Sequence, residues 1–105
     1  MSDLVRVVSL AEIPENSNRA FDVGGVSVLI ARTAAGVFAV ENRCSHAYQT
    51  LEGGRMKAVH ISCPLHGVRF DMRNGCPSGD LTDKPIRTWP VSIVDGEILL
   101  DMSAP

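Results

Sequence analysis

Apolar and polar residues alternate along this chain with the period of β-strands. A β-branched apolar run follows Gly24-Gly25, and the small residues from Thr33 to Gly36 predict a turn between two strands. Apolar stretches of strand length recur as far as the C-terminal end, separated by glycine, proline or polar residues. The pattern predicts strands at 4–9, 26–31, 37–41, 56–62, 68–72, 90–94 and 97–101.

Turn and helix signals support the same interpretation. Asp95-Gly96 stands between two apolar runs and predicts a two-residue hairpin, because both residues tolerate positive φ. Ser9 and Glu12 resemble a helix capping box, but Pro14 limits any helix there to about one turn. We therefore expect an all-β fold, a small antiparallel sandwich or barrel, with residues 1–105 forming a single domain.

Composition narrows the possible functions. Hydrophobic residues make up 45% of the 105 residues, and 12 acidic against 10 basic side chains give a net charge of −2. The basic residues are scattered, so binding to nucleic acid is not expected. No apolar stretch approaches the roughly 20 residues of a membrane-spanning helix. The first ten residues do not resemble a secretory signal, and we expect a cytoplasmic protein.

Cysteine and histidine supply the candidate chemistry. Three cysteines in a cytoplasmic chain argue against a disulfide framework and favour metal or cofactor binding. Two of them pair with histidines, as Cys44-x-His46 and, after sixteen residues, Cys63-x-x-His66. Both pairs lie in an insertion at about 42–80, whose glycines and prolines would let two loops turn toward one point.

Two kinds of metal centre would use two sulfurs and two nitrogens. One is a tetrahedral zinc site, and the other is a [2Fe–2S] cluster with thiolates on one iron and imidazoles on the other. Zinc fingers pair cysteine with cysteine and histidine with histidine, at spacings that this chain lacks. Because each loop here holds one cysteine and one histidine, the pattern fits two bridged irons better than one ion.

The two motifs carry a family resemblance. Cys44-Ser-His46 and Cys63-Pro-Leu-His66-Gly67 resemble the cluster-binding boxes of Rieske proteins, and the segment 70–77 resembles the residues after the second box in that family. Length and strand content are similar to the Rieske ferredoxins of bacterial aromatic-ring dioxygenase systems. The resemblance implies that Cys44 and Cys63 hold the buried iron and that His46 and His66 hold the exposed one. It implies no catalytic residue, since the protein would be an electron-transfer component and not an enzyme.

Departures from the family pattern indicate a low reduction potential. Respiratory Rieske proteins carry a disulfide between the boxes, and its positions correspond here to Gln49 and Leu65. They also carry a serine and a tyrosine that hydrogen-bond to the cluster sulfurs, where this chain has Val68 and Phe70. Fewer hydrogen bonds to sulfur disfavour reduction, so we expect a potential of roughly −150 mV rather than +300 mV.

The implied role is a shuttle of single electrons. The resemblance predicts a flavin-dependent ferredoxin reductase as donor, using NAD(P)H, and a Rieske non-haem iron terminal oxygenase as acceptor. A monomer is expected, because the carrier must visit two partners. Two alternatives stay open from the sequence: the small Rieske subunit of a larger reductase such as nitrite reductase, and a zinc-stabilised binding module.

Three further residues invite simpler interpretations. Cys76 has no partner at ligand spacing and is expected to be a small residue packed near the cluster. His60 is expected to be an outward or half-buried strand residue, and Trp89 is expected to serve core or loop packing.

Overall fold

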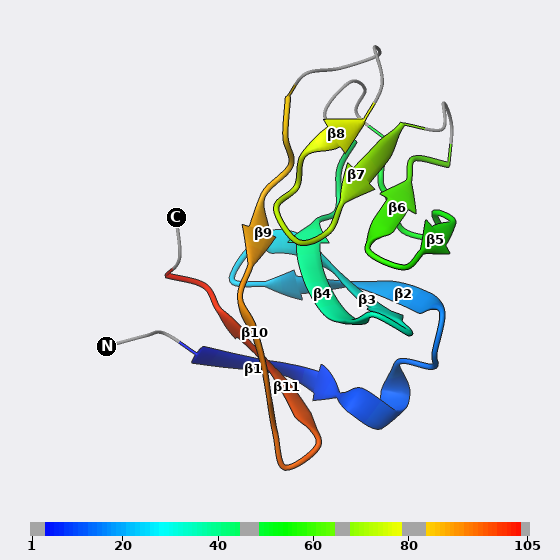
Figure 1. Ribbon diagram of the computed structural model, residues 1–105. Helices are drawn as coiled ribbons and strands as arrows, with labels where there is room; N and C mark the ends of the chain where they lie inside the picture. Colours follow the sequence, from blue (N-terminus) through cyan, green and yellow to red (C-terminus); the bar gives the residue numbers. More distant parts are fainter. Residues whose placement is uncertain (1–3, 45–48, 65–67, 79–83, 104–105) are drawn as a thin grey trace.

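The chain folds into three antiparallel sheets arranged in layers. The computed structural model describes residues 4–44, 49–64, 68–78 and 84–103. In Figure 1 the sheets succeed one another along the length of the molecule, which measures 40 × 28 × 19 Å. The described residues contain no α-helix, and no helix among them is long and apolar enough to cross a membrane. The predicted all-β antiparallel architecture is confirmed.

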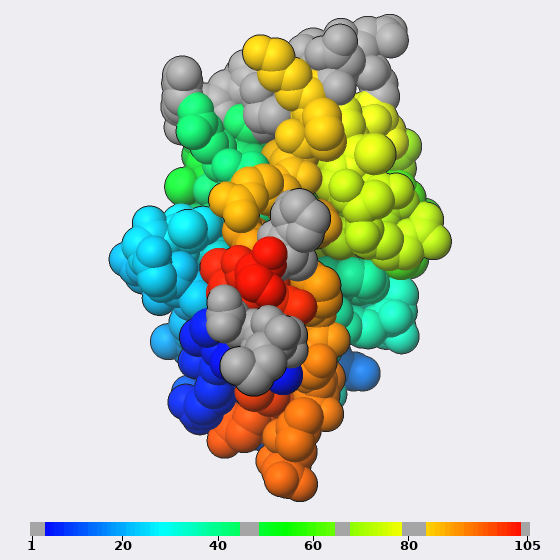
Figure 2. Space-filling view, turned by 90° about the vertical axis from the view of Figure 1, so that its left-hand side faces the viewer, coloured from blue at the N-terminus to red at the C-terminus, as the bar shows by residue number. Residues whose placement is uncertain are grey.

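The first layer, which we call the terminal sheet, joins the two ends of the chain. Its strands, in spatial order, are β1 (Leu4–Ser9), β11 (Glu97–Asp101) and β10 (Val91–Val94). Strand β11 pairs with both of the others in antiparallel register. Figure 2 shows blue β1 and orange-to-red β10 and β11 gathered at one end of the molecule, away from the yellow-green residues near β7 and β8.

The middle layer, the central sheet, is buried on both faces. Its strands, in spatial order, are β2 (Ser17–Val23), β3 (Val26–Thr33), β4 (Gly36–Glu41) and β9 (Thr88–Trp89). Val28 and Ile30 of β3 pack in a core shared with the terminal sheet, whereas Leu29 and Ala31 pack in a core on the opposite face. All four are 0% exposed. The continuous apolar run at 26–31 results from this double burial, because neither face of β3 meets water.

The third layer, the small sheet, covers the other face of the central sheet. Its strands, in order, are β5 (Met56–Lys57), β6 (His60–Ser62), β7 (Arg69–Asp71) and β8 (Pro77–Ser78). Ile61 of β6 and Phe70 of β7 are cross-strand partners and are both fully buried. They share one core with Leu29 and Ala31 of the central sheet.

The predicted hairpin between the last two strands is confirmed. Asp95 and Gly96 have φ of 51° and 76°, and they connect β10 to β11 through a two-residue turn. Positive φ at both positions is the type I′ geometry that suits the twist of paired strands. Gly24 and Gly25 connect β2 to β3 in the same way, with φ of 61° and 86°.

Strand β2 was not predicted from the sequence. Its residues, SNRAFDV, contain no apolar run, and only Val23 is buried. The strand is held instead by a seven-residue antiparallel register with β3, from Ser17↔Arg32 to Val23↔Val26. Backbone pairing with an already buried neighbour compensates for the weak side-chain pattern.

The single strand predicted at 56–62 is wrong. Ala58 has a φ of 54°, and the chain turns there into a hairpin that pairs Lys57 with His60. The Thr33 hydroxyl donates a hydrogen bond to the Ala58 carbonyl over 2.7 Å, which ties this turn to the central sheet. The two-residue strands β8 and β9 were also missed, because so short a segment carries no periodic signal.

The capping box expected at Ser9 does not form. Leu10–Glu12 is a short 3₁₀ helix, but the Ser9 side chain makes no cap hydrogen bond. The Ser9 hydroxyl donates to the Glu97 carboxylate over 3.0 Å instead. The side chain therefore joins β1 to β11, where Ser9 and Glu97 are cross-strand partners.

Gly75 holds the segment before β9 against the turn after β7. Its carbonyl accepts a 2.9 Å hydrogen bond from the Ile86 amide. A Cβ on Gly75 would overlap the Ile86 carbonyl oxygen, and the residue also has a φ of 79°. Only glycine fits this close backbone approach.

We expect Gly75→Ala to destabilise the protein by at least about 2 kcal/mol more than Gly25→Ala. Both glycines have positive φ, but a Cβ on Gly25 would meet nothing within 4 Å, so the two variants differ in steric overlap alone. Urea unfolding measures the difference in free energy. Equal losses in the two variants would contradict the close approach of Ile86 to Gly75.

Candidate metal centre

Cys44 lies just beyond the end of β4, at the start of the first predicted ligand loop. Its side chain is 1% exposed, so the sulfur faces the protein interior. The Cys44 amide donates a 2.7 Å hydrogen bond to the carbonyl of Gln49, five residues later in the chain, and this bond closes the segment between them into a loop. His46 falls between these two residues in the sequence and lies outside the described residues.

Cys63 occupies the equivalent place after β6. Its side chain is 2% exposed, and its amide donates a 2.7 Å hydrogen bond to the Val68 carbonyl. The offset is again five residues, and His66 falls inside it in the sequence but outside the described residues. Each cysteine therefore begins a segment that is closed by its own backbone hydrogen bond, and the two bonds span the same number of residues.

One hydrophobic core contains both cysteines. The side chains around them come from the central sheet, the small sheet and the segments between them: Leu29, Ala31, Val40, Leu51, Ile61, Val68, Phe70, Met72 and Ile86. Two segments nineteen positions apart in sequence are thus brought to one buried region, as predicted. Among the described residues no three His, Cys, Asp or Glu side chains form a metal-binding group, and both predicted histidine ligands lie outside those residues.

Asn42 anchors the first cysteine segment and was missed in the sequence. This side chain is 7% exposed, and its Oδ1 atom accepts hydrogen bonds from the amides of Leu51 (3.0 Å) and Glu52 (2.9 Å). Its Nδ2 atom donates to the Ser27 hydroxyl over 3.1 Å. Because Asn42 lies two residues before Cys44, these bonds tie the cysteine segment to the central sheet at Ser27. They also tie it to the chain that follows the segment, at Leu51 and Glu52. A lone asparagine after a strand gives no sequence signal for that role.

Gly54 lets the chain that follows the first cysteine segment pack closely against β6. A Cβ there would overlap the Ser62 carbonyl, one residue before Cys63. The Asn18 side chain holds this turn from β2, since its Nδ2 donates to the Gly54 carbonyl (3.1 Å) and its Oδ1 accepts from the Gly53 amide (2.7 Å). This turn, closed by a 2.8 Å hydrogen bond from the Gly54 amide to the Leu51 carbonyl, links the two cysteine segments.

A surface hollow lies beside each cysteine segment. One of about 460 Å³ is lined by Gly53, Arg55, Ser62, Cys63 and Pro64. Another of about 270 Å³ is lined by Asn42, Arg43, Gln49 and Thr50. Each hollow is lined by one exposed arginine, Arg55 in the first and Arg43 in the second.

The expected packing of Cys76 near the metal centre is wrong. Its side chain is exposed. The Cys76 carbonyl accepts a 2.9 Å hydrogen bond from the Asp71 amide, beside the Phe70↔Pro77 pair of β7 and β8. Since successive residues of a strand face opposite sides, Cys76 points away from the core that holds Phe70. His60, in contrast, is half-buried, as predicted.

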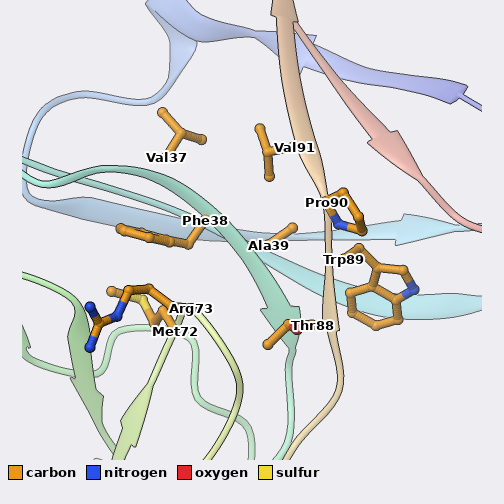
Figure 3. Close-up of a pocket in the computed structure, with 9 residues that line it drawn as sticks. All are labelled: Val37, Phe38, Ala39, Met72, Arg73, Thr88, Trp89, Pro90 and Val91. Atoms are coloured by element: carbon orange, nitrogen blue, oxygen red, sulfur yellow. The ribbon is translucent and has the colours of Figure 1, made fainter. Parts of the chain in front are cut away.

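A third hollow, between the central sheet and the turn after β7, offers no comparable chemistry. It has a volume of about 420 Å³ and is lined by Val37, Phe38, Ala39, Met72, Arg73, Thr88, Trp89, Pro90 and Val91. Figure 3 shows the Trp89 indole nitrogen turned away from Phe38 and Arg73. Trp89 is 4% exposed and packs in a core, which agrees with the expected packing role, and the Arg87 guanidinium lies 4.9 Å from its ring centroid.

Comparison with known proteins shows which family this chain is similar to. The family model for the Rieske [2Fe-2S] domain matches residues 3–90. The chain is 30% identical to an anthranilate 1,2-dioxygenase ferredoxin subunit of Burkholderia cepacia, over 86% of this chain and 83% of that one. It is 29% identical to the ferredoxin component of a naphthalene 1,2-dioxygenase system of Pseudomonas aeruginosa, over 94% and 95% of the two chains.

A solved structure agrees in fold as well as in sequence. The ferredoxin of carbazole 1,9a-dioxygenase from Nocardioides aromaticivorans IC177 superposes with a TM-score of 0.87 at 39% identity, covering 94% of this chain and 97% of that chain. The similarity therefore extends over nearly the whole length of each protein.

We expect Asn42→Leu to lower the free energy of unfolding by about 2–3 kcal/mol, because the buried Leu51 amide and its neighbour lose their acceptor. Asn42→Asp keeps an oxygen facing both amides and serves as the matched control, with a smaller loss expected. Urea unfolding and the iron content of the purified variants are the measurements. If both variants lost the same stability, the two amide hydrogen bonds would not be the source of the effect.

Proposed function

The chain belongs to the Rieske [2Fe–2S] domain family, and on that premise we propose that it carries single electrons between two proteins. The proposed donor is a flavin-dependent, NAD(P)H-oxidising ferredoxin reductase, and the proposed acceptor is the terminal oxygenase of a multicomponent aromatic-ring dioxygenase. The observation that carries the proposal is a pair of buried cysteines. Each begins a segment that a backbone hydrogen bond closes over five residues, and each segment includes a histidine in its sequence.

We assign Cys44, His46, Cys63 and His66 as the ligands of one [2Fe–2S] cluster. Two buried thiol groups in one core, with an imidazole two or three residues after each, fit the donor set of two sulfurs and two nitrogens. When bound, such a cluster takes up and returns one electron without making or breaking a substrate bond. The surrounding apolar side chains exclude water from both cysteines.

Two residues of the core support a low reduction potential. Val68 is 3% exposed and Phe70 is 0% exposed, and both pack in the core that holds the cysteines. Neither side chain can donate a hydrogen bond to sulfur. Their position supports a potential near the lower end of the Rieske range, roughly −150 mV. Such a value suits a carrier reduced by a flavoprotein.

We also propose the organisation in which this carrier works. Residues 1–105 form one domain, with a cluster-binding insertion at about 42–80 that includes the small sheet. A monomer in the cytoplasm would meet both partners by diffusion. The chain's coverage of its relatives, above 80% in each direction, supports this single-domain arrangement.

Two other functions use the same residues and can be separated by simple observations. As the small subunit of a nitrite reductase, the protein would copurify with a large subunit instead of accepting electrons from a separate reductase. As a zinc module, it would be colourless, whereas a Rieske cluster is red-brown. The similarity to ferredoxin components over nearly the whole chain favours the carrier.

We expect Cys63→Ser to lose the cluster and Cys76→Ser to retain it, because Cys63 is buried between the two sheets and Cys76 is exposed. Iron and acid-labile sulfide contents, with the EPR spectrum of the dithionite-reduced protein, are the measurements. Loss of the cluster in the Cys76 variant would show that the ligand assignment is wrong. Zinc without sulfide in the wild type would refute the carrier itself.

We expect Phe70→Tyr to raise the reduction potential by roughly 40 mV, the equivalent of one hydrogen bond of about 1 kcal/mol to the reduced form. Phe21→Tyr is the matched control, since Phe21 packs in the other core, with the terminal sheet. Protein-film voltammetry measures both potentials. An unchanged potential in the folded Phe70 variant, or an equal shift in both, would contradict the explanation from missing hydroxyls.

A further inference from the structure

The outer face of the small sheet is lined by basic side chains. Residues directly opposite one another on paired strands share a face. One cross-strand row of this face contains Arg55, Ser62, Arg69 and Ser78, and the next contains Lys57, His60 and Asp71. The intervening row contains the buried Ile61 and Phe70, which point into the core. The two rows named first therefore face solvent.

Positive charge on this face is not neutralised within the described part of the chain. Arg55, Lys57 and Arg69 are exposed, and neither Arg55 nor Arg69 forms an ion pair with a described residue. Asp71 is already bound to Arg73, with a 2.8 Å distance from Oδ2 to Nη2. That guanidinium lowers the pKa of Asp71 from 3.8 to about 2, so the carboxylate stays ionised and paired at neutral pH. The surplus charge is left to Arg55, Lys57 and Arg69.

The basic face adjoins the second cysteine. Ser62 immediately precedes Cys63, and its amide donates a 2.8 Å hydrogen bond to the Arg55 carbonyl. Arg55 and Cys63 line the same 460 Å³ hollow. Arg69 is the cross-strand partner of Ser62 on its other side. The two arginines thus flank Ser62, about 10 Å apart across two strand spacings.

The distribution of charge along the sequence also concentrates positive charge in the segment that contains this face. Residues 42–90 contain seven basic and four acidic side chains, a net charge of +3, and the rest of the chain contains three and eight, a net charge of −5. The basic half is the one that includes the candidate ligands. A segment with net positive charge is attracted to an acidic surface before contact.

We propose that the outer face of the small sheet is a docking surface for an electron-transfer partner whose own contact surface is acidic, with a partner carboxylate seated over Ser62 between Arg55 and Arg69. This inference rests on the proposed electron-carrier function and adds the chemistry of the partner. Guanidinium groups on either side and a hydroxyl between them match the acceptor geometry of a carboxylate. Contact at this face brings the partner next to the cysteine-bearing end.

The test uses the holoprotein and fluorescein-labelled poly-L-glutamate as an acidic probe, with binding followed by fluorescence anisotropy at low and high salt. We expect the double variant Arg55→Gln/Arg69→Gln to bind about tenfold more weakly at low salt. The matched control is Arg6→Gln/Arg19→Gln, which has the same net charge. Arg6 lies on β1 and pairs with Glu97, and Arg19 lies over the Phe21 ring, so both are outside this face. The control is expected to bind like the wild type.

Equal weakening in the two double variants would show a general charge effect and would overturn the docking surface. Unchanged binding in the Arg55/Arg69 variant would overturn it as well. The visible spectrum and dithionite reduction of each variant provide the separate readout. A protein that lacks a reducible cluster refutes the proposed function, whereas a normal cluster with unaltered probe binding refutes the docking surface alone.

Discussion

Burial of the central sheet on both faces is the constraint on which the rest of the structure depends. Strand β3 sends Val28 and Ile30 into the core shared with the terminal sheet, and Leu29 and Ala31 into the core shared with the small sheet. At about 25 cal/mol per Å² of apolar area, such complete burial is the main favourable contribution to folding. Because one strand serves two cores, the terminal sheet and the cysteine-bearing half are held in a fixed relation.

Polar contacts then determine where the cysteine segments lie on this frame. Asn42 binds the amides of Leu51 and Glu52, Asn18 binds the turn at Gly53 and Gly54, and the Thr33 hydroxyl binds Ala58. Each of these donors or acceptors comes from the central sheet or from its edge. The bond from the Leu51 amide to Asn42 is buried and therefore costly to break, so it holds the first loop more firmly than apolar packing alone would. A buried metal centre needs that rigidity, because its ligands must be in place together.

The charged side chains and the core side chains of the small sheet lie on opposite faces. Apolar side chains surround the two cysteines, while basic side chains occupy the opposite face of the same strands. Strand alternation makes this possible, since adjacent residues such as Arg69 and Phe70 point to opposite sides. The small sheet thus turns apolar side chains toward the two cysteines and basic side chains toward solvent.

The sequence by itself determined the strand class, the Asp95-Gly96 hairpin and the pairing of each cysteine with a histidine, because these depend on local periodicity and spacing. Only the tertiary structure decided that 56–62 turns at Ala58, that polar β2 becomes a strand, and that Cys76 faces solvent. It alone showed Asn42 as an anchor and aligned Arg55 with Arg69. These features depend on which strands pair and in what register, and pairing is set by contacts between residues far apart in the chain.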